Sequence, residues 1–355
     1  MKTSIHVGRW RAVVAHSVLW GLAVWPVGAL THDRPGSVLR FPLVTVQADG
    51  TDTLIQLTNV SNLTSYLQCA YVSGLGSCSG NGTPCATTGE CGGAGSCVGV
   101  CASESFTVEL TRQQPTHWLA SIGRADGDGP PGLFGPEVPA VPTMPFLGEL
   151  VCVQVNQDEF PILGNAFIGH ATVREGSSGA RSKYAAAIHE GLGEYQPPEV
   201  DLDDVEFASC PAEWTFSHFA EGVEDPAVGF GSSIQSTLTV APCSRDLGFD
   251  QAFGVSVRVS VTNEFESTIG RTVSVSCWRH FSLSDPDFLG VFDPGIAGSL
   301  HLRTRLSSTT TSGFIAQAIE HRDPGGAGAT PGAAAIPMQS DGVGSSDSIA
   351  LPVVP

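Results

Sequence analysis

The sequence predicts an all-β protein made of two antiparallel β-sandwiches, with a Cys-rich loop inserted in the first sandwich. Short runs in which apolar and polar residues alternate recur along the 355-residue chain, and this period of two is typical of half-buried strands. The 42 Gly and 24 Pro suit the turns between such strands, and a charged content of only 15% argues against a helical bundle or coiled coil. Ten Cys indicate a disulfide-bonded protein.

Residues 52–72 contain a strand–turn–strand arrangement on which the rest of the prediction is based. Their two β-type runs, TLIQLTN and SYLQCAYV, are joined by an Asn/Ser/Thr turn, and the second run carries Cys69. Residues 254–279 repeat this arrangement, with a run that ends in Thr-Asn, a polar turn and a second run that carries Cys277. The repetition predicts two related halves.

Residues 1–29 have the three parts of a secretory signal peptide. Three cationic residues open the segment, residues 12–24 are mostly apolar, and small residues end at Ala29. A membrane anchor is the alternative, but the apolar run falls short of the roughly 20 residues that a spanning helix needs. We therefore expect cleavage near Ala29, a mature chain without a membrane span, and export to the periplasm or the extracellular space.

The expected first sandwich covers residues 30–198 and the second covers 199–355. The first contains the Cys-rich insertion 78–101, and the second contains a Gly/Ala/Ser-rich loop at 323–346. Residues 196–204 are Pro-rich and acidic, as expected for a linker. Strands are expected at 37–46, 53–59, 65–72, 105–111, 117–120, 148–155, 166–173, 212–219, 234–241, 253–262, 272–278, 298–306, 313–319 and 348–354, where the last is either a closing edge strand or a frayed tail.

All ten Cys are predicted to form structural disulfides. Six lie close together in sequence and four are dispersed, so the simplest partition has three bridges among the six and two among the four. A bridge from Cys69 across the sandwich to Cys152 is the alternative. Zinc is disfavoured, because only one pair among the six has the C-x₂₋₄-C spacing of tetrathiolate sites. The six are Cys69, Cys78, Cys85, Cys91, Cys97 and Cys101, and the four are Cys152, Cys210, Cys243 and Cys277.

Motifs for catalysis are absent or incomplete in the sequence. No G-x-S-x-G, P-loop or G-x-G-x-x-G pattern occurs, and the H-E-x-x-H pattern that begins at His189 fails because Gly193 replaces the second His. His218, Glu264 and His321 form a metal or catalytic site only if the fold brings them together. We therefore predict no catalytic residue, no cofactor and no metal ligand, and we favour a protein that is not an enzyme.

Acidic segments begin calcium motifs without completing them. Residues 126–129 (DGDG) resemble the start of a calcium-binding loop, but Pro130 occupies the next ligand position. Asp201, Asp203 and Asp204 either hold calcium between the domains or belong to a solvated linker, and we favour the linker.

The net charge of −18 limits the possible partners. So acidic a surface repels nucleic-acid phosphates and anionic lipid head groups, which leaves protein or carbohydrate at the cell surface. A carbohydrate-binding module would present exposed aromatic residues in a row. Among Trp118, Trp214 and Trp278, the phase of its strand allows exposure only for Trp278, but a lone Trp is more often part of a core or an interface.

The strand–Asn–strand unit resembles bacterial immunoglobulin-like sandwiches. The segments SVLRFPLVTV, TLIQLTNVSN, YLQCAYV, ELTRQQPTHWLAS, GELVCVQV, VSVTNEFE and VSCWR are similar to those of uncharacterised exported proteins of Gram-negative bacteria. The resemblance covers most of the mature chain and implies two immunoglobulin-like β-sandwiches. Its motifs are structural, so it implies no catalytic residues.

We predict an exported, non-catalytic β-sandwich protein with a binding, adhesive or structural role at or beyond the cell surface. A secreted hydrolase or metal-dependent enzyme on the same scaffold is the first alternative, and it requires His, Asp and Glu side chains that converge in a cleft. A carbohydrate-binding module is the second alternative.

Overall fold

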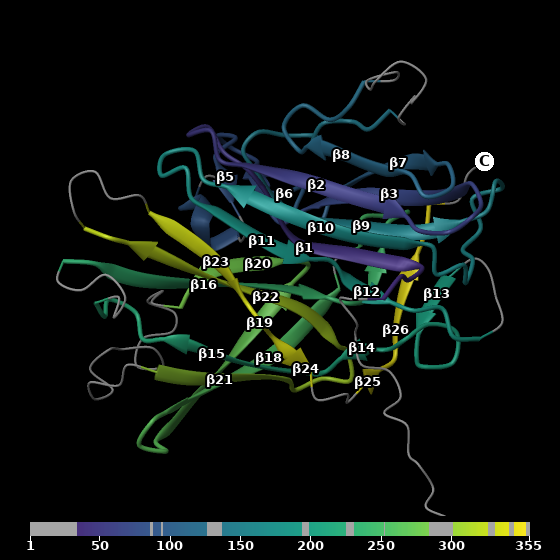
Figure 1. Cartoon of the computed structure of the whole chain (residues 1–355). Coiled ribbons are helices and arrows are strands. Elements are labelled where there is room, and N and C mark those ends of the chain that lie inside the picture. Colours follow the sequence, from purple (N-terminus) through teal and green to yellow (C-terminus); the bar gives the residue numbers. More distant parts are fainter. Residues whose placement is uncertain are drawn as a thin grey trace, which may run out of the picture.

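The computed structural model of the protein describes residues 34–85, 88–93, 95–125, 137–193, 199–224, 231–251, 253–283, 301–325, 331–340 and 344–352. Within these residues the fold is all-β, as predicted, and the only helical segment is the 3-10 turn η1 (Thr88–Cys91). All strand pairings are antiparallel except the pairing of β17 with β26 (Figure 1). The predicted signal peptide, residues 1–29, lies outside the described residues.

The first half of the chain forms two sheets that pack face to face. Strand β1 contacts β2 and β10 of the other sheet, and the side chains of Leu39, Phe41 and Leu57 meet above Gly169. Sheet A has the order β12 (Ala187–His189), β1 (Val38–Val46), β9 (Phe146–Val155), β3 (Ser65–Ser73), β7 (Ser103–Leu110), and sheet B has the order β11 (Arg181–Ala185), β10 (Phe167–Arg174), β2 (Asp52–Asn59), β8 (Pro115–Leu119).

The second half also forms a five-stranded and a four-stranded sheet. Strand β18 alternates as predicted, since its Val side chains are buried and the residues between them are more exposed. Sheet C has the order β19 (Thr268–Ser276), β18 (Gly254–Asn263), β21 (His301–Ser308), β15 (Glu213–Phe219), β24 (Gln339–Ser340), and sheet D has the order β20 (Arg279–Ser282), β16 (Ser233–Pro242), β22 (Phe314–Asp323), β23 (Gly332–Ile336).

Short strands correct two predictions made for loops. The linker expected at 196–204 contains β13 (Glu199–Leu202), which pairs with β26 (Asp347–Ala350) and so ties the middle of the chain to its end. The loop expected at 323–346 contains β23, β24 and β25 (Gly344–Ser345), because β22, β15 and β14 (Cys210–Pro211) provide them with partners. The remaining short strands are β4 (Gly76–Cys78), β5 (Pro84–Cys85), β6 (Cys97–Val98) and β17 (Arg245–Asp246).

The Thr-Asn units that suggested two related halves have different connections. Strand β2 belongs to sheet B and β3 to sheet A, so the turn after Asn59 carries the chain from one sheet to the other. Strands β18 and β19 form a hairpin within sheet C. Both Asn side chains nevertheless brace their turns: Asn59 donates to the carbonyl oxygens of Leu63 and Leu110, and Asn263 accepts from the N–H groups of Phe265 and Ser267.

The two halves share one hydrophobic core instead of forming separate units. Strands β1, β3 and β9 are buried on both faces, although a sandwich exposes the outer face of each sheet. Their second face is covered by the second half, where β1 contacts β16 and β22. Figure 1 shows sheet D lying directly against the first half, with sheet C beyond it.

A buried ion triad lies between the halves. Glu149 of β9 accepts hydrogen bonds from Arg40 Nη2 of β1 and from Arg245 Nε of β17, each at 2.6 Å. Arg40 also donates to the carbonyl oxygens of Pro242 (2.9 Å) and Cys243 (3.2 Å) in the second half. The side chains of Arg40 and Glu149 are fully buried. The triad and the two carbonyl contacts therefore link β1 and β9 of the first half to residues 242–245 of the second half.

Candidate functional site

The structure pairs all ten Cys, in a pattern that differs from the simplest partition. Cys69 bonds to Cys152 and Cys101 bonds to Cys277, so two Cys of the sequence cluster pair outside it. Cys101–Cys277 joins the insertion of the first half to the second half. The other bridges are Cys78–Cys91, Cys85–Cys97 and Cys210–Cys243.

The Cys69–Cys152 bridge lies within a sheet and does not cross the sandwich. The two residues are directly opposite each other in β3 and β9, with their Cα atoms 4.0 Å apart. Directly opposed residues approach this closely at the non-hydrogen-bonded positions of an antiparallel pair. The bridge therefore reinforces sheet A, whose register the sequence spacing does not reveal.

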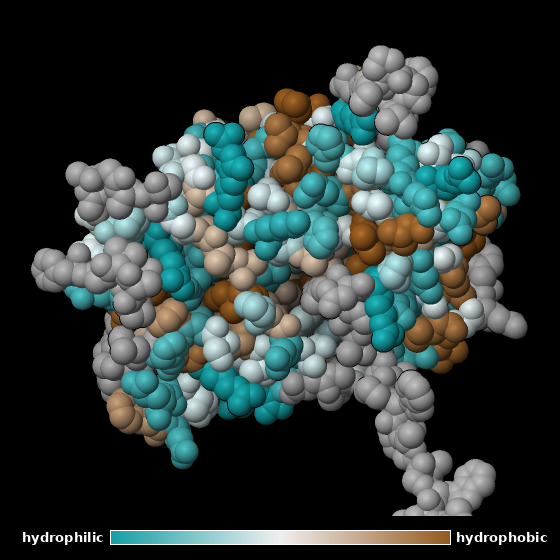
Figure 2. Space-filling view, in the orientation of Figure 1, coloured by the Kyte–Doolittle hydropathy of each residue, from teal (hydrophilic) through white to brown (hydrophobic). Residues whose placement is uncertain are grey.

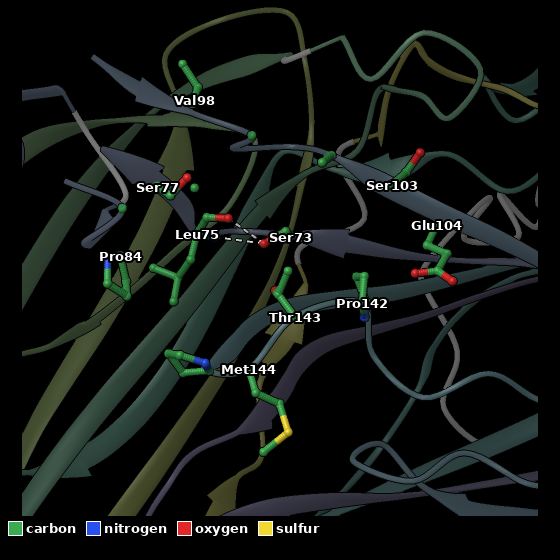
Figure 3. Close-up of a pocket in the computed structure, with 15 residues that line it drawn as sticks. Ser73, Leu75, Ser77, Pro84, Val98, Ser103, Glu104, Pro142, Thr143 and Met144 are labelled. Atoms are coloured by element: carbon green, nitrogen blue, oxygen red, sulfur yellow. Dashed lines mark hydrogen bonds between the residues drawn. The ribbon is translucent and has the colours of Figure 1, made fainter. Parts of the chain in front are cut away.

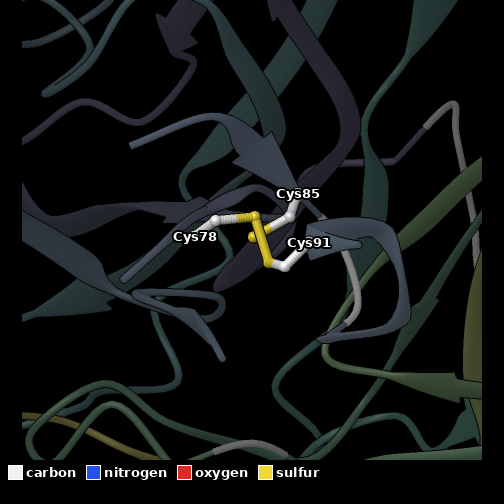
Figure 4. Close-up of side chains that lie close together, drawn as sticks. All are labelled: Cys78, Cys85 and Cys91. Carbon is white, nitrogen blue, oxygen red and sulfur yellow. A yellow bond between two sulfur atoms is a disulfide. The ribbon is translucent and has the colours of Figure 1, made fainter. Parts of the chain in front are cut away.

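Two neighbouring disulfides hold the insertion. The Sγ atoms of Cys78, Cys85 and Cys91 lie within 4.8 Å of one another, and Figure 4 shows the Cys78–Cys91 bond beside the sulfur of Cys85. These Cys form a small core of their own, which Cys97 completes. Because metal ligation requires free thiolates, the oxidised sulfurs serve as a scaffold.

This scaffold forms one wall of a cleft. The cleft has a volume of about 500 Å³ and is lined by residues from segments 73–77, 82–84, 98–104 and 142–145 (Figure 3). The first three segments are the end of β3, the insertion and the start of β7, and the fourth is the loop before β9. Segments far apart in the sequence therefore build the site, where the five-stranded sheet A ends.

Local interactions shape the walls of the cleft. The Ser73 hydroxyl accepts a hydrogen bond from the Leu75 N–H at 3.3 Å and donates to its carbonyl oxygen at 2.5 Å, which turns the chain from β3 into β4. A Cβ on Gly76 would collide with the Val98 carbonyl oxygen, so the close pairing of β4 with β6 requires glycine there. On the opposite wall the Met144–Pro145 peptide bond is cis, and Met144 is 63% exposed.

The chemistry of the cleft favours binding over catalysis. Among the described residues that line it, Glu104 is the only titratable one, beside Pro, Gly, Ser, Thr and apolar side chains. General acid–base catalysis needs at least one positioned donor or acceptor near the reacting bond, commonly paired with a second group. An apolar cleft with one carboxylate instead suits a ligand that combines apolar surface with a cationic group.

The residues on which an enzyme was predicted to depend lie apart. His218 is buried in β15, where its Nε2 is 2.8 Å from Thr304 Oγ1. Glu264 is exposed in the turn after β18, and His321 forms an ion pair with Glu175 of the first half. The convergence that the alternative hypothesis of an enzyme requires of these three residues is therefore not found.

The three Trp residues in the described part of the chain are part of the core. Their indole N–H groups donate to Tyr71 Oη (Trp118, 2.7 Å), to the Phe314 carbonyl oxygen (Trp214, 2.8 Å) and to the Pro42 carbonyl oxygen (Trp278, 2.7 Å). Trp278 is only 5% exposed because it packs against Gly74 between the two halves. Trp278 therefore takes the core or interface position that a lone Trp usually has, and none of the three forms a sugar-binding platform.

The acidic residues after β13 stabilise a turn. Asp203 Oδ1 accepts the N–H groups of Val205 and Glu206, and the carboxylate of Asp204 accepts both the N–H and the hydroxyl of Ser209. These bonds give Asp203 and Asp204 a structural role. Residues 126–129, the other calcium candidate, lie outside the described residues.

Exposed apolar side chains are scattered over the surface. Ile122, Met144, Phe249 and Phe265 are each more than half exposed, and they come from four different loops. Figure 2 shows one face of the molecule, on which small hydrophobic patches lie among hydrophilic residues. Of these four residues, only Met144 lines the cleft.

We expect stability to fall as the pH drops from about 6.5 to about 4. Burial lowers the pKa of His189 and of His218 from 6.5 to about 4. In this window the unfolded chain binds protons at both residues while the folded chain does not, so acid favours unfolding. Each residue should cost about 3 kcal/mol when the transition is complete. Urea denaturation at pH 7 and pH 4.5 measures the difference.

Replacement of one of these residues tests the cause. His218→Gln should reduce the loss of stability between pH 7 and pH 4.5, whereas the exposed His117→Gln serves as the control and should leave it unchanged. An unaltered pH dependence in His218→Gln would show that other groups are responsible.

Comparisons with known proteins identify no family for this chain. No protein-family model matches the chain, and no curated protein matches it. Solved structures that match include the crystal structure of Thermotoga maritima 1070, at 13% identity over 36% of this chain and 94% of that chain, with a TM-score of 0.25. A likeness this weak carries no argument about the fold or the function of the chain.

Proposed function

We propose that the protein is exported and non-catalytic, and that it binds a ligand in the cleft between the disulfide-bonded insertion and the loop before β9. Its role is binding or adhesion at or beyond the cell surface. The observation that carries this proposal is the cleft itself: about 500 Å³, built on a covalently fixed wall and lined by apolar and small residues with Glu104 as its one titratable group among those described.

Export is supported by the cysteine chemistry. Every one of the ten Cys is in a disulfide, and disulfides persist mainly in oxidising compartments. No helix among the described residues is long and apolar enough to cross a membrane. Residues 1–29, with the composition of a signal peptide, would provide the route.

Rigidity supports binding as the role of the cleft. The insertion is closed by Cys78–Cys91 and Cys85–Cys97 and is fastened to the second half by Cys101–Cys277. A preformed site does not lose the conformational entropy that a flexible loop loses on binding, so the same contacts give higher affinity.

The two Met residues of the mature chain provide the test. Met144 lines the cleft and Met338 packs against the core elsewhere, so ¹³C-methyl-labelled Met reports on binding with an internal control. A screen of short peptides and oligosaccharides should yield ligands that shift the Met144 methyl signal and leave Met338 unchanged. If ligands of either class shift Met338 alone, or if none shifts Met144, the cleft is not the binding site.

The mass of the secreted protein tests export separately. With thiols alkylated before reduction, the native protein should show cleavage near Ala29 and no alkylated Cys. An uncleaved chain, or an alkylated Cys, would contradict the proposal of an exported, fully oxidised protein.

A further inference from the structure

The free edge of sheet A adjoins the cleft. Among the described residues, β7 pairs only with β3. The Ser103 N–H points away from β3, because it donates to Asp250 Oδ1 outside the sheet at 2.8 Å. Backbone direction alternates with a period of two along a strand, so the N–H and C=O groups of Ser105, Thr107 and Glu109 also point outward. No described backbone group pairs with them there.

Apart from the charges of Glu104 and Glu109, strand β7 lacks the features that usually protect a sheet edge. It is eight residues long, contains neither Pro nor Lys, and pairs with β3 in continuous register without a bulge. Edge strands of this length are normally shortened, bent or marked with such residues, because an unprotected edge accepts another strand. Addition of a peptide strand to an exposed edge is a common mode of recognition.

We propose that the ligand is an extended peptide that adds a strand to β7 and places its C-terminal part in the cleft. The proposal rests on the cleft being the binding site and names its ligand class. Ser103 and Glu104 belong both to the start of β7 and to the lining of the cleft, so the edge and the cleft form one continuous surface. All pairings in sheet A are antiparallel, so a strand added antiparallel to β7 would have its C-terminal end beside Ser105, because Asp250 already accepts the outward N–H of Ser103.

Charge defines the peptide further. Glu104 is the one titratable group among the described lining residues, Asp250 lies beside Ser103, and the chain carries a net charge of −18. An acidic peptide is repelled here, whereas a Lys or Arg is attracted to Glu104. The ligand is therefore a β-forming segment followed by a basic residue and a short apolar end that enters the cleft.

A synthetic peptide with blocked ends and the sequence TVTVKPL is a suitable probe. Titrated into protein labelled at the Met methyl groups and at backbone nitrogen, it should shift the Met144 methyl and the amides of residues 105–109 with one dissociation constant. Met338 should not respond. The same peptide with Glu in place of Lys should bind at least about tenfold more weakly, because attraction to Glu104 becomes repulsion.

Matched variants separate strand pairing from occupation of the cleft. Ser105→Pro removes an outward N–H that the sheet does not use, and it should weaken the probe at least about tenfold. Ser105→Ala keeps that N–H and should bind like the original protein. Glu104→Gln should weaken binding about fivefold, and Glu266→Gln, at the exposed turn after β18, is the charge control.

The outcomes distinguish this inference from the proposed function. If the probe shifts Met144 but Ser105→Pro binds it unchanged, strand addition is wrong and the cleft remains a binding site. If no probe or screened ligand shifts Met144, both proposals fail. If sedimentation shows that the protein forms a dimer and Ser105→Pro abolishes it, the occupant of the edge is a second copy of the chain, and the peptide proposal is overturned.

Discussion

Replacement of Glu149 by Gln should lower the free energy of unfolding by about 3–5 kcal/mol. The substitution keeps the size of the side chain but removes the negative charge that Arg40 and Arg245 share. Both guanidinium groups are fully or almost fully buried, at 0% and 2% exposure. An uncompensated charge in such surroundings is much more costly than a lost surface interaction. Urea denaturation at pH 7 measures the change.

An exposed ion pair provides the control for this experiment. Arg34 is 73% exposed where it pairs with Glu190, so Arg34→Gln should change stability by less than about 1 kcal/mol. Replacing Arg40, Glu149 and Arg245 together by apolar residues of similar size should restore most of the loss, since no buried charge then remains. A loss of under 1 kcal/mol in Glu149→Gln would mean that water reaches the triad.

Removal of the Cys101–Cys277 bridge should also lower the free energy of unfolding by a large amount. This disulfide spans 176 residues, and the loop-closure model assigns roughly 5 kcal/mol to a bridge of that span. The double variant Cys101→Ser with Cys277→Ser should therefore unfold at a much lower urea concentration. Both residues are buried between the halves, so the variant also tests how firmly the shared core holds them without a covalent link.

The Cys78–Cys91 bridge is the matched comparison. It spans 13 residues, for which the same model gives about 3 kcal/mol, and it lies in the small core of the insertion. Its removal should loosen residues 76–98, detected as faster hydrogen exchange, while the main unfolding transition moves less than in the other variant. If the main unfolding transition moved by an equal amount of urea in the two variants, the idea that the insertion unfolds as a local unit would be contradicted.

The sequence pattern predicted strands best where one face of the strand is exposed to solvent. Val255, Val257, Val259 and Val261 alternate with polar residues, and β18 follows that pattern from end to end. The runs that became β1 and β9 contain few polar interruptions, which is the pattern of strands buried on both faces. That difference in pattern was a signal for the shared core, and the prediction of two separate sandwiches did not use it.

Other features could not be read from local pattern. Strand β23, GAAAI, lacks the β-branched and aromatic residues that mark strands, and it exists because β22 offers it a partner. The Cys69–Cys152 bridge depends on the register of β3 with β9. The cleft requires that residues 142–145 lie against the insertion, and no spacing in the sequence records that contact.

The long bridge between the halves also determines how the molecule would respond to a pulling force. Cys101–Cys277 removes 176 residues from the length that can be stretched. At roughly 3.4 Å per residue, about 600 Å of chain cannot be extended while the disulfide is intact. A load applied to the two ends would pass through the disulfide, so strands β7 to β19 between the two Cys would not be stretched, whereas the residues before Cys101 and after Cys277 would be. The bridge therefore limits how far the molecule can lengthen under tension, a property that the proposed adhesive role would use.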